Sequence, residues 1–511
     1  MFVGDWLARR AQLTPDKVAV VDTVAGRDVT YAAWNAQANR SAHWLRALGV
    51  ERGDRVAVLA MNSMVYLEIW FACAKLGAVL QNLNWRLNKA ELAAIVADAA
   101  PRALLYGREF AATAAALRAT APSLRHMVSI GDGASGAGSC LAEREAFPAT
   151  APVAAPVHAD EPWVICYTGG STGLPKGAIL THGNVLANIA NTVAGWGVRA
   201  DDVAVLNAPL FHTGGLNVFT APLAYVGGTS ILCRHFDADQ IFDLLAERRF
   251  TLLFGVPTMY VMLQRHPRWA RADFSPCRIV ISGGAPCPPP VYERFWAKGV
   301  PFKSGYGLTE AGPNNFWLPD TDVQRKPGAV GLPLPHVEIR IVDEQGQPCA
   351  PGEVGELWIR GPHVTPGYWN NPAATEAVLV DGWLHTGDLA HGDREGYVTI
   401  VGRRKEMFIS GGENIYPAEV ENALYSHPAV AEAAVIAVAD AVWGEVGRAV
   451  VALHAGADLS EQQLLAFLGE RIGRYKQPRS IVFVEALPRT GTGKIDKLRL
   501  ALLYGTAESA T

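Results

Sequence analysis

Strand-like and helix-like segments alternate through the first part of the chain, and this alternation constrains its fold more than any other feature. Apolar residues recur with helical spacing in three segments, and two short apolar runs between them have the length of buried strands. The segments are helices over Tyr31–Leu48, Tyr66–Leu76 and Ala90–Ala99 and strands over Arg55–Leu59 and Ala103–Tyr106. This order predicts βαβ units around a largely parallel sheet.

A second alternating part follows residues 131–156, which are rich in Gly, Ala, Ser and Pro and are predicted to form a flexible connection. Four short strands and one helix are expected after it. The strands lie over Val203–Leu206, Ser230–Cys233, Thr251–Phe254 and Arg278–Ile281, and the helix lies over Asp239–Arg248. Beyond Pro335, nearly alternating apolar and polar residues over Val337–Val342 and Val354–Ile359 predict antiparallel β structure.

The end of the chain has the pattern of a separate small α+β unit. Pro417 suits the first turn of a helix that runs to Tyr425, and Ser460 with Gln463 forms a capping box for a second helix. Strands are expected over 434–438, 449–453 and 481–484. Because 511 residues are too many for one hydrophobic core, about two to four domains or subdomains are expected.

Composition argues against several classes of protein. Lys and Arg number 45 against 49 Asp and Glu, a net charge of −4, so a nucleic-acid binder is not indicated. The seven cysteines have no Cys-x-x-Cys pair and no metal-ligand spacing, which fits unpaired thiols in a reducing cytoplasm. Neither a signal peptide nor a run of about 18 apolar residues is seen, so no transmembrane segment is predicted. The sequence leaves the oligomeric state open, with a homodimer as one option.

The stretch from Tyr167 to Gly177 reads Tyr-Thr-Gly-Gly-Ser-Thr-Gly-Leu-Pro-Lys-Gly and follows an apolar strand at Trp163–Cys166. Its glycines allow the backbone to approach an anion, its hydroxyl groups add donors, and Lys176 adds a positive charge. The loop is therefore predicted to bind phosphate rather than to be a simple surface turn. It lacks the order of a Walker loop, because Lys176 follows a proline.

Five further islands, rich in glycine and polar residues, interrupt the apolar pattern. Ser282-Gly-Gly-Ala-Pro286 follows a buried strand, so it lies at the edge where open α/β sheets bind ligands. The others are Gly305-Tyr-Gly-Leu-Thr-Glu310, His385-Thr-Gly-Asp388, the charged stretch from Gly402 to Pro417, and Pro488-Arg-Thr-Gly-Thr-Gly-Lys494. Each island alone reads as a turn, whereas all five in this order indicate a shared function.

In this order the islands resemble those of the adenylate-forming superfamily, which includes acyl-CoA synthetases and aryl-CoA ligases, from about Asp5 to Leu500. The resemblance implies a large N-terminal domain over residues 1–404, built from two α/β subdomains and a β-barrel-like one. A small α+β C-terminal domain over 405–511 is implied to move on a hinge. The implied enzyme is a carboxylate–CoA ligase. It converts a carboxylate and ATP to acyl-AMP and pyrophosphate, and the thiol of CoA then gives acyl-CoA and AMP.

The resemblance also implies a role for each motif. Lys494 would bridge the substrate carboxylate and the α-phosphate, Thr309 would contact the α-phosphate, and Glu310 would ligate Mg²⁺. Tyr306 would stack on adenine. The implied ATP-binding residues are Thr168, Gly169, Gly170, Ser171, Thr172, Gly173, Lys176, Gly283, Gly284, Ala285, Tyr306, Gly307, Asp388 and Arg403, of which the last two would hold the ribose. Gly169 is a departure, because many relatives carry Ser or Thr there.

Lys405 matches the hinge of the superfamily. Rotation at this residue would withdraw Lys494 and bring a channel for the pantetheine of CoA to the site. The channel is assigned to Ser410, Gly411, Gly412 and Glu413, and the acyl pocket to Phe211, His212, Gly214, Gly215, Val256 and Gly305, with His212 as a catalytic gate. The local sequence resembles both bacterial fatty-acyl and feruloyl-CoA ligases, so a fatty acid and a cinnamate-like aromatic acid both stay open.

Two alternative functions share these motifs. A stand-alone adenylation enzyme would load the pantetheine of a carrier protein with the same loop chemistry. A nucleotide-binding protein without turnover is disfavoured, because Lys176, Glu310 and Lys494 are all present.

Overall fold

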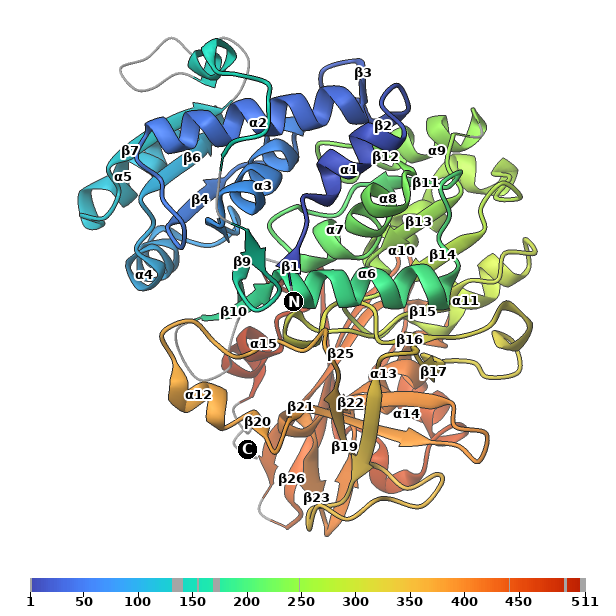
Figure 1. Ribbon diagram of the computed structural model, residues 1–511. Helices are drawn as coiled ribbons and strands as arrows, with labels where there is room; N and C mark the ends of the chain where they lie inside the picture. Colours follow the sequence, from blue (N-terminus) through green and yellow to red (C-terminus); the bar gives the residue numbers. More distant parts are fainter. Residues whose placement is uncertain are drawn as a thin grey trace.

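The computed structural model describes residues 2–130, 141–153, 156–168, 175–247, 249–440, 442–490 and 494–505. Figure 1 shows two helix-covered sheets in the blue-to-yellow part of the chain, with the orange and red strands of two further sheets beneath them. The large α/β N-terminal part and the small C-terminal α+β unit expected from the sequence are both present.

The first sheet has six strands in the order β10-β9-β5-β4-β6-β7, and all neighbours are parallel except β9 and β10. Helices cover both of its faces: Val58 packs with α2 and α3, whereas the next residue, Leu59, points the other way and packs with α4 and α5. The elements are β4 (Arg55–Leu59), β5 (Val79–Asn82), β6 (Ala103–Gly107), β7 (His126–Ile130), β9 (Pro162–Thr168), β10 (Lys176–Thr181), α2 (Tyr31–Ala47), α3 (Met64–Leu76), α4 (Lys89–Ala99) and α5 (Ala111–Thr120).

The second sheet has seven strands in the order β15-β14-β13-β11-β12-β2-β3, parallel except for β2 and β3. Val205 and Leu253 pack with α9 to α11, whereas Ala204 and Leu252 face Leu223 of α8 on the opposite side. The elements are β2 (Val18–Asp22), β3 (Arg27–Thr30), β11 (Val203–Leu206), β12 (Thr229–Leu232), β13 (Leu252–Gly255), β14 (Ile279–Ser282), β15 (Lys303–Ser304), α6 (His182–Trp196), α7 (Thr213–Asn217), α8 (Thr220–Val226), α9 (Ala238–Ala246), α10 (Pro257–Arg265) and α11 (Pro289–Trp296).

The third sheet is the antiparallel structure expected beyond Pro335. Its strands follow the order β18-β19-β21-β20, and β22 pairs with β21. They are β18 (Glu338–Val342), β19 (Gly355–Arg360), β20 (Leu379–Val380), β21 (Trp383–Gly392) and β22 (Val398–Arg403). Shorter elements of the N-terminal part are β1 (Phe2–Val3), α1 (Trp6–Leu13), β8 (Val157–His158), β16 (Phe316–Trp317), β17 (Leu332–Pro333) and α12 (Pro372–Glu376).

The C-terminal unit is a five-stranded sheet with helices on both faces. Val420 and Leu464 pack with Val451 on one face, and Leu500 packs with Val450 on the other. The capping box expected at Ser460 and Gln463 begins α14. The elements are β23 (Phe408–Ser410), β24 (Glu413–Ile415), β25 (Val430–Asp440), β26 (Gly444–Leu453), β27 (Ser480–Val484), α13 (Pro417–Tyr425), α14 (Glu461–Gly469) and α15 (Lys497–Tyr504).

The flexible connection expected over 131–156 is wrong for its described part. Residues 131–140 and 154–155 lie outside the described residues, but Leu141–Ala146 forms a 3₁₀ helix, η2. From it the buried Arg144 donates hydrogen bonds to Glu68 of α3 and Ser41 of α2. Breaking such a buried ion pair by removing one partner is strongly destabilising. This part of the connection is therefore anchored to the first sheet's helices.

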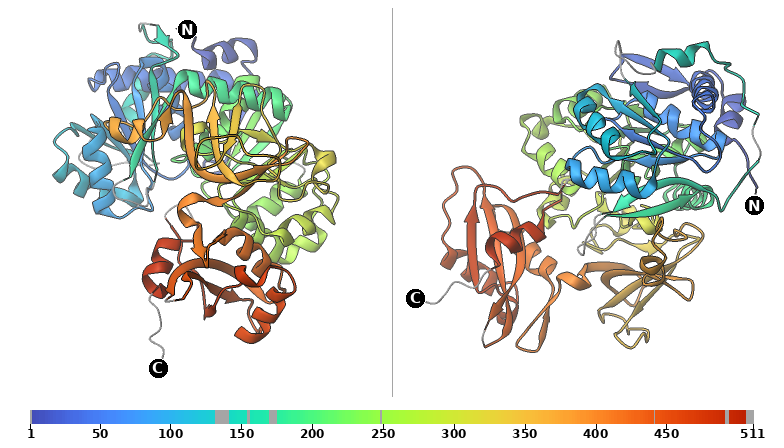
Figure 2. Two further views of the ribbon diagram at one scale, coloured as in Figure 1. Left: turned by 90° about the horizontal axis from the view of Figure 1, so that it is seen from below. Right: turned by 90° about the vertical axis from the view of Figure 1, so that its left-hand side faces the viewer.

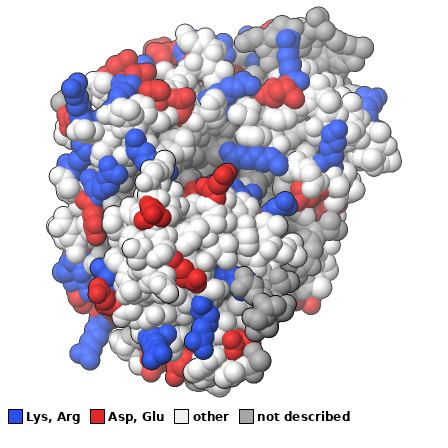
Figure 3. All heavy atoms as spheres, turned by 180° about the vertical axis from the view of Figure 1, so that it is seen from behind, with Lys and Arg blue, Asp and Glu red and all other residues white. Residues whose placement is uncertain are grey.

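The C-terminal unit, red in Figure 2, packs against one side of the large N-terminal part in both views. On the face drawn in Figure 3, Lys and Arg are interspersed with Asp and Glu, as the net charge of −4 suggests. Among the described residues, no helix combines the length and the apolar character that crossing a bilayer requires.

Candidate active site

The predicted motifs meet where the three sheets of the N-terminal part approach one another. The loops after β14 and β15 contain the Gly283–Ala285 and Tyr306–Glu310 motifs, at the carboxyl ends of parallel strands. Backbone bonds tie these loops to each other: the amide of Gly305 donates to the carbonyl of Ser282 at 2.8 Å. The third sheet adds Asp388 and Arg403, which face each other on β21 and β22.

Asp388, Tyr306 and Arg403 form one hydrogen-bonded group. The hydroxyl of Tyr306 donates to Oδ2 of Asp388 at 2.5 Å, and Nε of Arg403 lies 2.6 Å from Oδ1. Burial raises the pKa of Asp388, and Arg403 and Tyr306 oppose that shift. Because each carboxylate oxygen keeps a second lone pair, Asp388 can still accept bonds from two neighbouring hydroxyls.

Glu310 is held at the start of the phosphate loop. It lies in the 3₁₀ turn η4 (Thr309–Ala311), and its Oε1 accepts from the hydroxyls of Thr168 at 3.4 Å and Tyr368 at 2.8 Å. The other oxygen of Glu310 has no hydrogen-bond partner in the part of the chain that the structure describes. This arrangement leaves a carboxylate oxygen available to a cation.

Lys176 begins β10 beside this carboxylate, with its Nζ 5.3 Å from the centre of the Tyr368 ring. The predicted phosphate-binding residues Gly169, Gly170, Ser171, Thr172 and Gly173 lie outside the described residues. The two described ends of the loop, Thr168 and Lys176, are joined by the antiparallel pairing of β9 and β10.

Lys494 reaches the same site from the C-terminal unit. Its Cε lies 3.9 Å from the position that a Cβ would take on Gly284. Desolvation and the neighbouring Arg403 lower the pKa of Lys494, while Asp388 opposes the shift. Lys494, more than two hundred residues after the Ser282–Pro286 motif in sequence, therefore lies beside that motif in space.

Close packing in the loop after β15 requires a glycine at position 307. A Cβ on Gly307 would lie 2.2 Å from the carbonyl oxygen of Pro313, a distance that no side chain can occupy. Any other residue would therefore push apart the loop that contains Tyr306 and Glu310.

His212 is the N-cap residue of α7 and lines one of two cavities in this region. Its Nδ1 accepts from the amide of Gly214 at 3.2 Å, so the neutral ring carries its proton on Nε2. Burial, with Lys494 and Arg86 nearby, lowers the pKa of His212 to about 4. The ring is therefore neutral at physiological pH.

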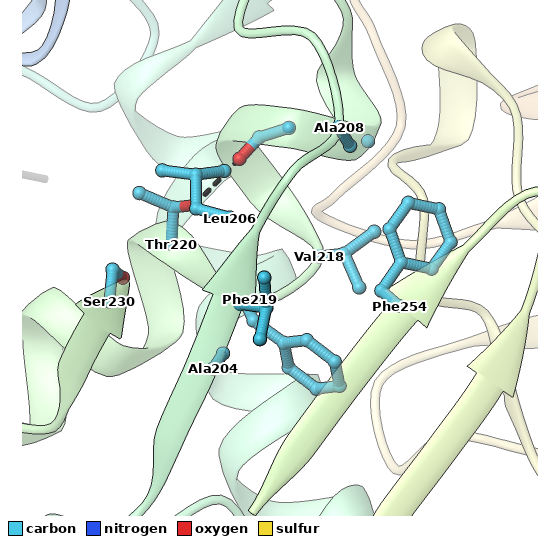
Figure 4. Close-up of a pocket in the computed structure, with 11 residues that line it drawn as sticks. Ala204, Leu206, Ala208, Val218, Phe219, Thr220, Ser230 and Phe254 are labelled. Carbon is cyan, nitrogen blue, oxygen red and sulfur yellow. Dashed lines mark hydrogen bonds between the residues drawn. The ribbon is translucent and has the colours of Figure 1, made fainter. Parts of the chain in front are cut away.

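The cavity on one side of His212, here called the central cavity, lies between the first sheet and the Thr309 turn. Its lining includes Asn82, Cys166, Tyr167, Phe211, His212 and Thr309. A second cavity, here called the sheet cavity, lies between the second sheet and α7 and α8. Its lining includes Ala204, Leu206, Gly214, Gly215, Val218, Phe219 and Phe254 (Figure 4).

Phe254 separates the sheet cavity from the predicted nucleotide-binding loop. A Cβ on Gly214 would lie 3.3 Å from this ring, and a Cβ on Gly283 would lie 3.0 Å from it. Glycine at positions 214 and 283 therefore leaves room for the Phe254 ring between the predicted acyl pocket and the loop after β14.

The structure distributes the predicted acyl-pocket residues over three places. Phe211 and His212 line the central cavity, and Gly214 and Gly215 line the sheet cavity. Val256 and Gly305 line neither of these two cavities. Val256 lies next to Gly284, with its Cγ1 3.7 Å from the built Cβ position, and Gly305 lies against Ile281.

The predicted hinge and CoA channel lie at the junction of the two parts. Lys405 lies in the exposed 3₁₀ turn η6 (Arg404–Glu406), directly after β22. Ser410 and Glu413 flank a tight turn in which Gly411 and Gly412 have φ values of 58° and 89°. The amide of Gly411 donates to the carbonyl of Trp443 at 3.0 Å, so the turn is held by its own domain.

Several residues of the site carry no signal in the sequence. Tyr368 follows Pro366-Gly367 in a loop without periodicity, and only the fold brings its hydroxyl to Glu310. Arg86, close enough to His212 to lower its pKa, lies in a turn before α4. The residues of β11 and β12 that line the sheet cavity can be recognised in the sequence only as parts of buried strands.

Comparison with known proteins places the chain in one family over almost its whole length. Residues 7–369 match the family described as AMP-binding enzyme, and residues 419–494 match the AMP-binding enzyme C-terminal domain. The chain is 43% identical to a feruloyl-CoA synthase from Amycolatopsis over 98% of its length and 99% of the relative. It is 36% identical to the long-chain-fatty-acid–CoA ligase FadD13 of Mycobacterium tuberculosis, with 98% of each covered. The crystal structure of ATP-bound MatB from Rhodopseudomonas palustris superposes with a TM-score of 0.90 at 35% identity, covering 98% and 99% of the two chains.

Proposed function

The chain belongs to the family of AMP-binding enzymes, and on this premise we propose that it is an ATP-dependent ligase that joins an aromatic, cinnamate-like acid to CoA. The relative named for feruloyl-CoA is more similar than the relative named for long-chain fatty acids, at 43% against 36% identity. A fatty acid is the second candidate for the substrate.

The first half-reaction brings together two anions, the substrate carboxylate and the α-phosphate of ATP. Their repulsion must be offset by positive charge, and Lys494 beside Gly284 supplies it together with the neighbouring Arg403. Thr309 contacts the α-phosphate from η4, and Lys176 neutralises the departing pyrophosphate. The ribose hydroxyls bind Asp388, whose carboxylate Arg403 and Tyr306 orient.

Glu310 fits a magnesium site. Among the described residues there is no group of three or more His, Cys, Asp or Glu side chains that could hold a metal. A single carboxylate oxygen suits Mg²⁺, which usually takes one or two protein carboxylates together with substrate phosphates and water. When bound, such an ion would offset the negative charge of ATP, and Tyr368 and Thr168 keep the Glu310 carboxylate in place to hold it.

The second half-reaction needs a different arrangement of the same chain. The thiol of CoA attacks the acyl-adenylate carbonyl and AMP leaves, so Lys494 is no longer required. Rotation at Lys405, the proposed boundary between domains 1–404 and 405–511, brings the turn of Ser410, Gly411, Gly412 and Glu413 to the site as the wall of a pantetheine channel. The neutral His212 lies where it can orient either the carboxylate or the thiol.

The approach of Lys494 to Gly284 carries this proposal, and its removal tests it. Lys494→Ala should slow acyl-adenylate formation about 100- to 1,000-fold, the cost of losing one charge-stabilising group. Thioester formation from supplied acyl-adenylate should change little. Pyrophosphate release and acyl-CoA formation measure the two steps separately, and Lys89→Ala, at an exposed helix start, is the control. Equal loss in both steps would overturn the role of Lys494.

Free CoA and a carrier-protein pantetheine are chemically the same acceptor. Thioester formation with free CoA supports the ligase, whereas transfer only to a pantetheinylated carrier protein supports the alternative. We place the enzyme in the cytoplasm, as the six free cysteines in the described part of the chain suggest. Sedimentation analysis decides whether it is a homodimer.

A further inference from the structure

Two ion pairs hold the neighbours of the proposed pivot residue to opposite parts of the molecule. Nη1 of Arg404 lies 3.2 Å from Oε2 of Glu356 on β19, in the N-terminal part. Nζ of Lys497, the first residue of α15, lies 2.9 Å from Oε2 of Glu406. Lys405 therefore lies between a neighbour that is bound to the third sheet and a neighbour that is bound to the C-terminal unit.

Lys497 has a second carboxylate partner within the C-terminal unit. Its Nζ lies 2.8 Å from Oε1 of Glu421 on α13, and the same oxygen accepts from the amide of Val435 on β25 at 2.8 Å. Burial disfavours the charged form of Lys497, but the two carboxylates outweigh burial and raise the pKa of this lysine. Because loss of one partner would leave largely buried charges uncompensated, these ion pairs hold α15 firmly against its surroundings.

The segment from Lys494 to Lys497 is short and has little freedom of its own. The amide of Thr490 donates to the carbonyl of Lys494 at 2.8 Å, and the amide of Asp496 donates to the carbonyl of Pro488 at 2.8 Å. The Asp496 side chain also caps α15. The ion pairs of Lys497 therefore help to fix the backbone from which the side chain of Lys494 reaches the nucleotide-binding loop.

We propose that Lys497 is a positioning residue that couples Lys494 to the pivot at Lys405. With Glu406 and Glu421 it forms a cluster, here called the hinge joint, which connects the residue after the pivot to the segment that contains Lys494. Rotation at the pivot then moves Lys494 together with the whole C-terminal unit. This inference rests on the proposed function and adds to it how Lys494 is placed for one half-reaction and withdrawn for the other.

The hinge joint acts on the position of Lys494 and not on its charge. A misplacement of about 1 Å in a reacting site can cost on the order of 100-fold in rate. ATP is bound in the proposal mainly by residues of the N-terminal part, which the hinge joint does not contact. Loss of the joint should therefore lower kcat for adenylation and leave KM for ATP almost unchanged. Thioester formation from supplied acyl-adenylate should change little, because that step does not use Lys494.

The first test removes the charge of Lys497 and keeps an unbranched side chain. Lys497→Met should lower kcat for pyrophosphate release about 10- to 100-fold. Lys497→Arg keeps the charge and should restore most of that rate, which a change in packing alone would not explain. Arg471→Met is the matched control, because it removes a surface ion pair with Glu470 in the same unit. It should leave both half-reactions unchanged.

Glu421→Gln tests the hinge joint from another side, including the case that Lys497→Met fails to fold. It removes the carboxylate charge but keeps an oxygen that can accept from the amide of Val435. Its effect should have the same direction, and in the double variant the two losses should not add, because both changes break one cluster.

The failures of the two proposals can be told apart. Normal adenylation in both Lys497→Met and Glu421→Gln, or equal loss of both half-reactions, would overturn the coupling and leave the ligase proposal standing. Absence of pyrophosphate release by the unaltered enzyme with every aromatic and fatty acid offered would overturn the ligase proposal itself.

Discussion

Tyr368 determines the position of Glu310 more directly than any residue of the recognisable motifs. Its hydroxyl donates to the carboxylate at 2.8 Å, and its ring lies near the ammonium group of Lys176. A residue without a motif thus joins the proposed metal ligand to the end of the phosphate loop. Sequence reasoning misses it because it lies 58 residues from Glu310, in a loop without periodicity.

Tyr368→Phe removes this bond and keeps the ring. Loss of a hydrogen bond that contributes about 1 kcal/mol net should raise roughly fivefold the Mg²⁺ concentration needed for half-maximal adenylation. Magnesium titration of pyrophosphate release measures the change. Tyr397→Phe, which removes the hydroxyl that donates to Asp322 outside the site, is the matched control. An unchanged magnesium requirement in Tyr368→Phe would contradict the role given to Glu310.

His212 should not titrate in the working range of the enzyme. Its pKa is lowered to about 4, so between pH 5.5 and pH 8, roughly, the imidazole stays neutral. As the pH falls from about 6.5 to 4, the unfolded chain gains a proton that the folded ring does not bind. The neutral His212 therefore lowers the free energy of unfolding as the pH falls from about 6.5 to 4, and it does not affect that free energy above about pH 6.5.

The pH dependence of kcat/KM for thioester formation checks this. His212→Gln should lower the rate about tenfold and keep the profile of the unaltered enzyme between roughly pH 5.5 and 8. A break near pH 6.5 that only the unaltered enzyme shows would mean that His212 works as a titrating base.

At the scale of elements, the turn η6 is the point at which one conformation can be fixed. Lys405 lies in a 3₁₀ turn, and proline locks φ near −65°, a value such a turn already has. Lys405→Pro should therefore hold the arrangement in which Lys494 lies at Gly284. Adenylation should stay within about twofold, and thioester formation should fall at least about 100-fold.

Single-turnover measurements of the two half-reactions separate these effects. Lys405→Ala serves as the control, because it removes the same side chain without fixing the backbone. If Lys405→Pro forms acyl-CoA at the normal rate, the hinge does not lie at this residue.

The helices and strands are predicted correctly from the sequence where the residues at their ends and the pattern of apolar positions indicate the same bounds. Pro417 marks the first turn of α13, and its predicted end at Tyr425 is also correct. The connection over 131–156 is mispredicted in part, because composition does not reveal that Arg144 pairs with Glu68 a long way back in the chain. The boundaries of β12 to β14 shift by one residue, since nearly all their positions are buried and the sequence shows no alternation that would fix the ends.

At the scale of the whole molecule, the comparisons confirm the family, the fold class and the ligase class that the motifs predict. The individual site roles stay predictions. The geometry joins Asp388, Tyr306 and Arg403 in one hydrogen-bonded group and places Lys494 beside Gly284. Glu310 is held separately, by Thr168 and Tyr368.

In the whole molecule Lys494 lies beside Gly284, and the turn of Gly411 and Gly412 lies on the same C-terminal unit. Our proposal gives Lys494 the first half-reaction and gives the turn the second, after the C-terminal unit has moved. On that proposal the adenylate forms first and the thioester second, at one site.

The stoichiometry of the products tests this account most directly. The enzyme is incubated with ATP, Mg²⁺, CoA and 4-hydroxycinnamate, and nucleotide and thioester products are quantified together by mass spectrometry. One AMP and one pyrophosphate should form for each acyl-CoA, with acyl-AMP accumulating when CoA is left out. Formation of ADP and phosphate with the thioester, or thioester without acyl-AMP, would contradict it.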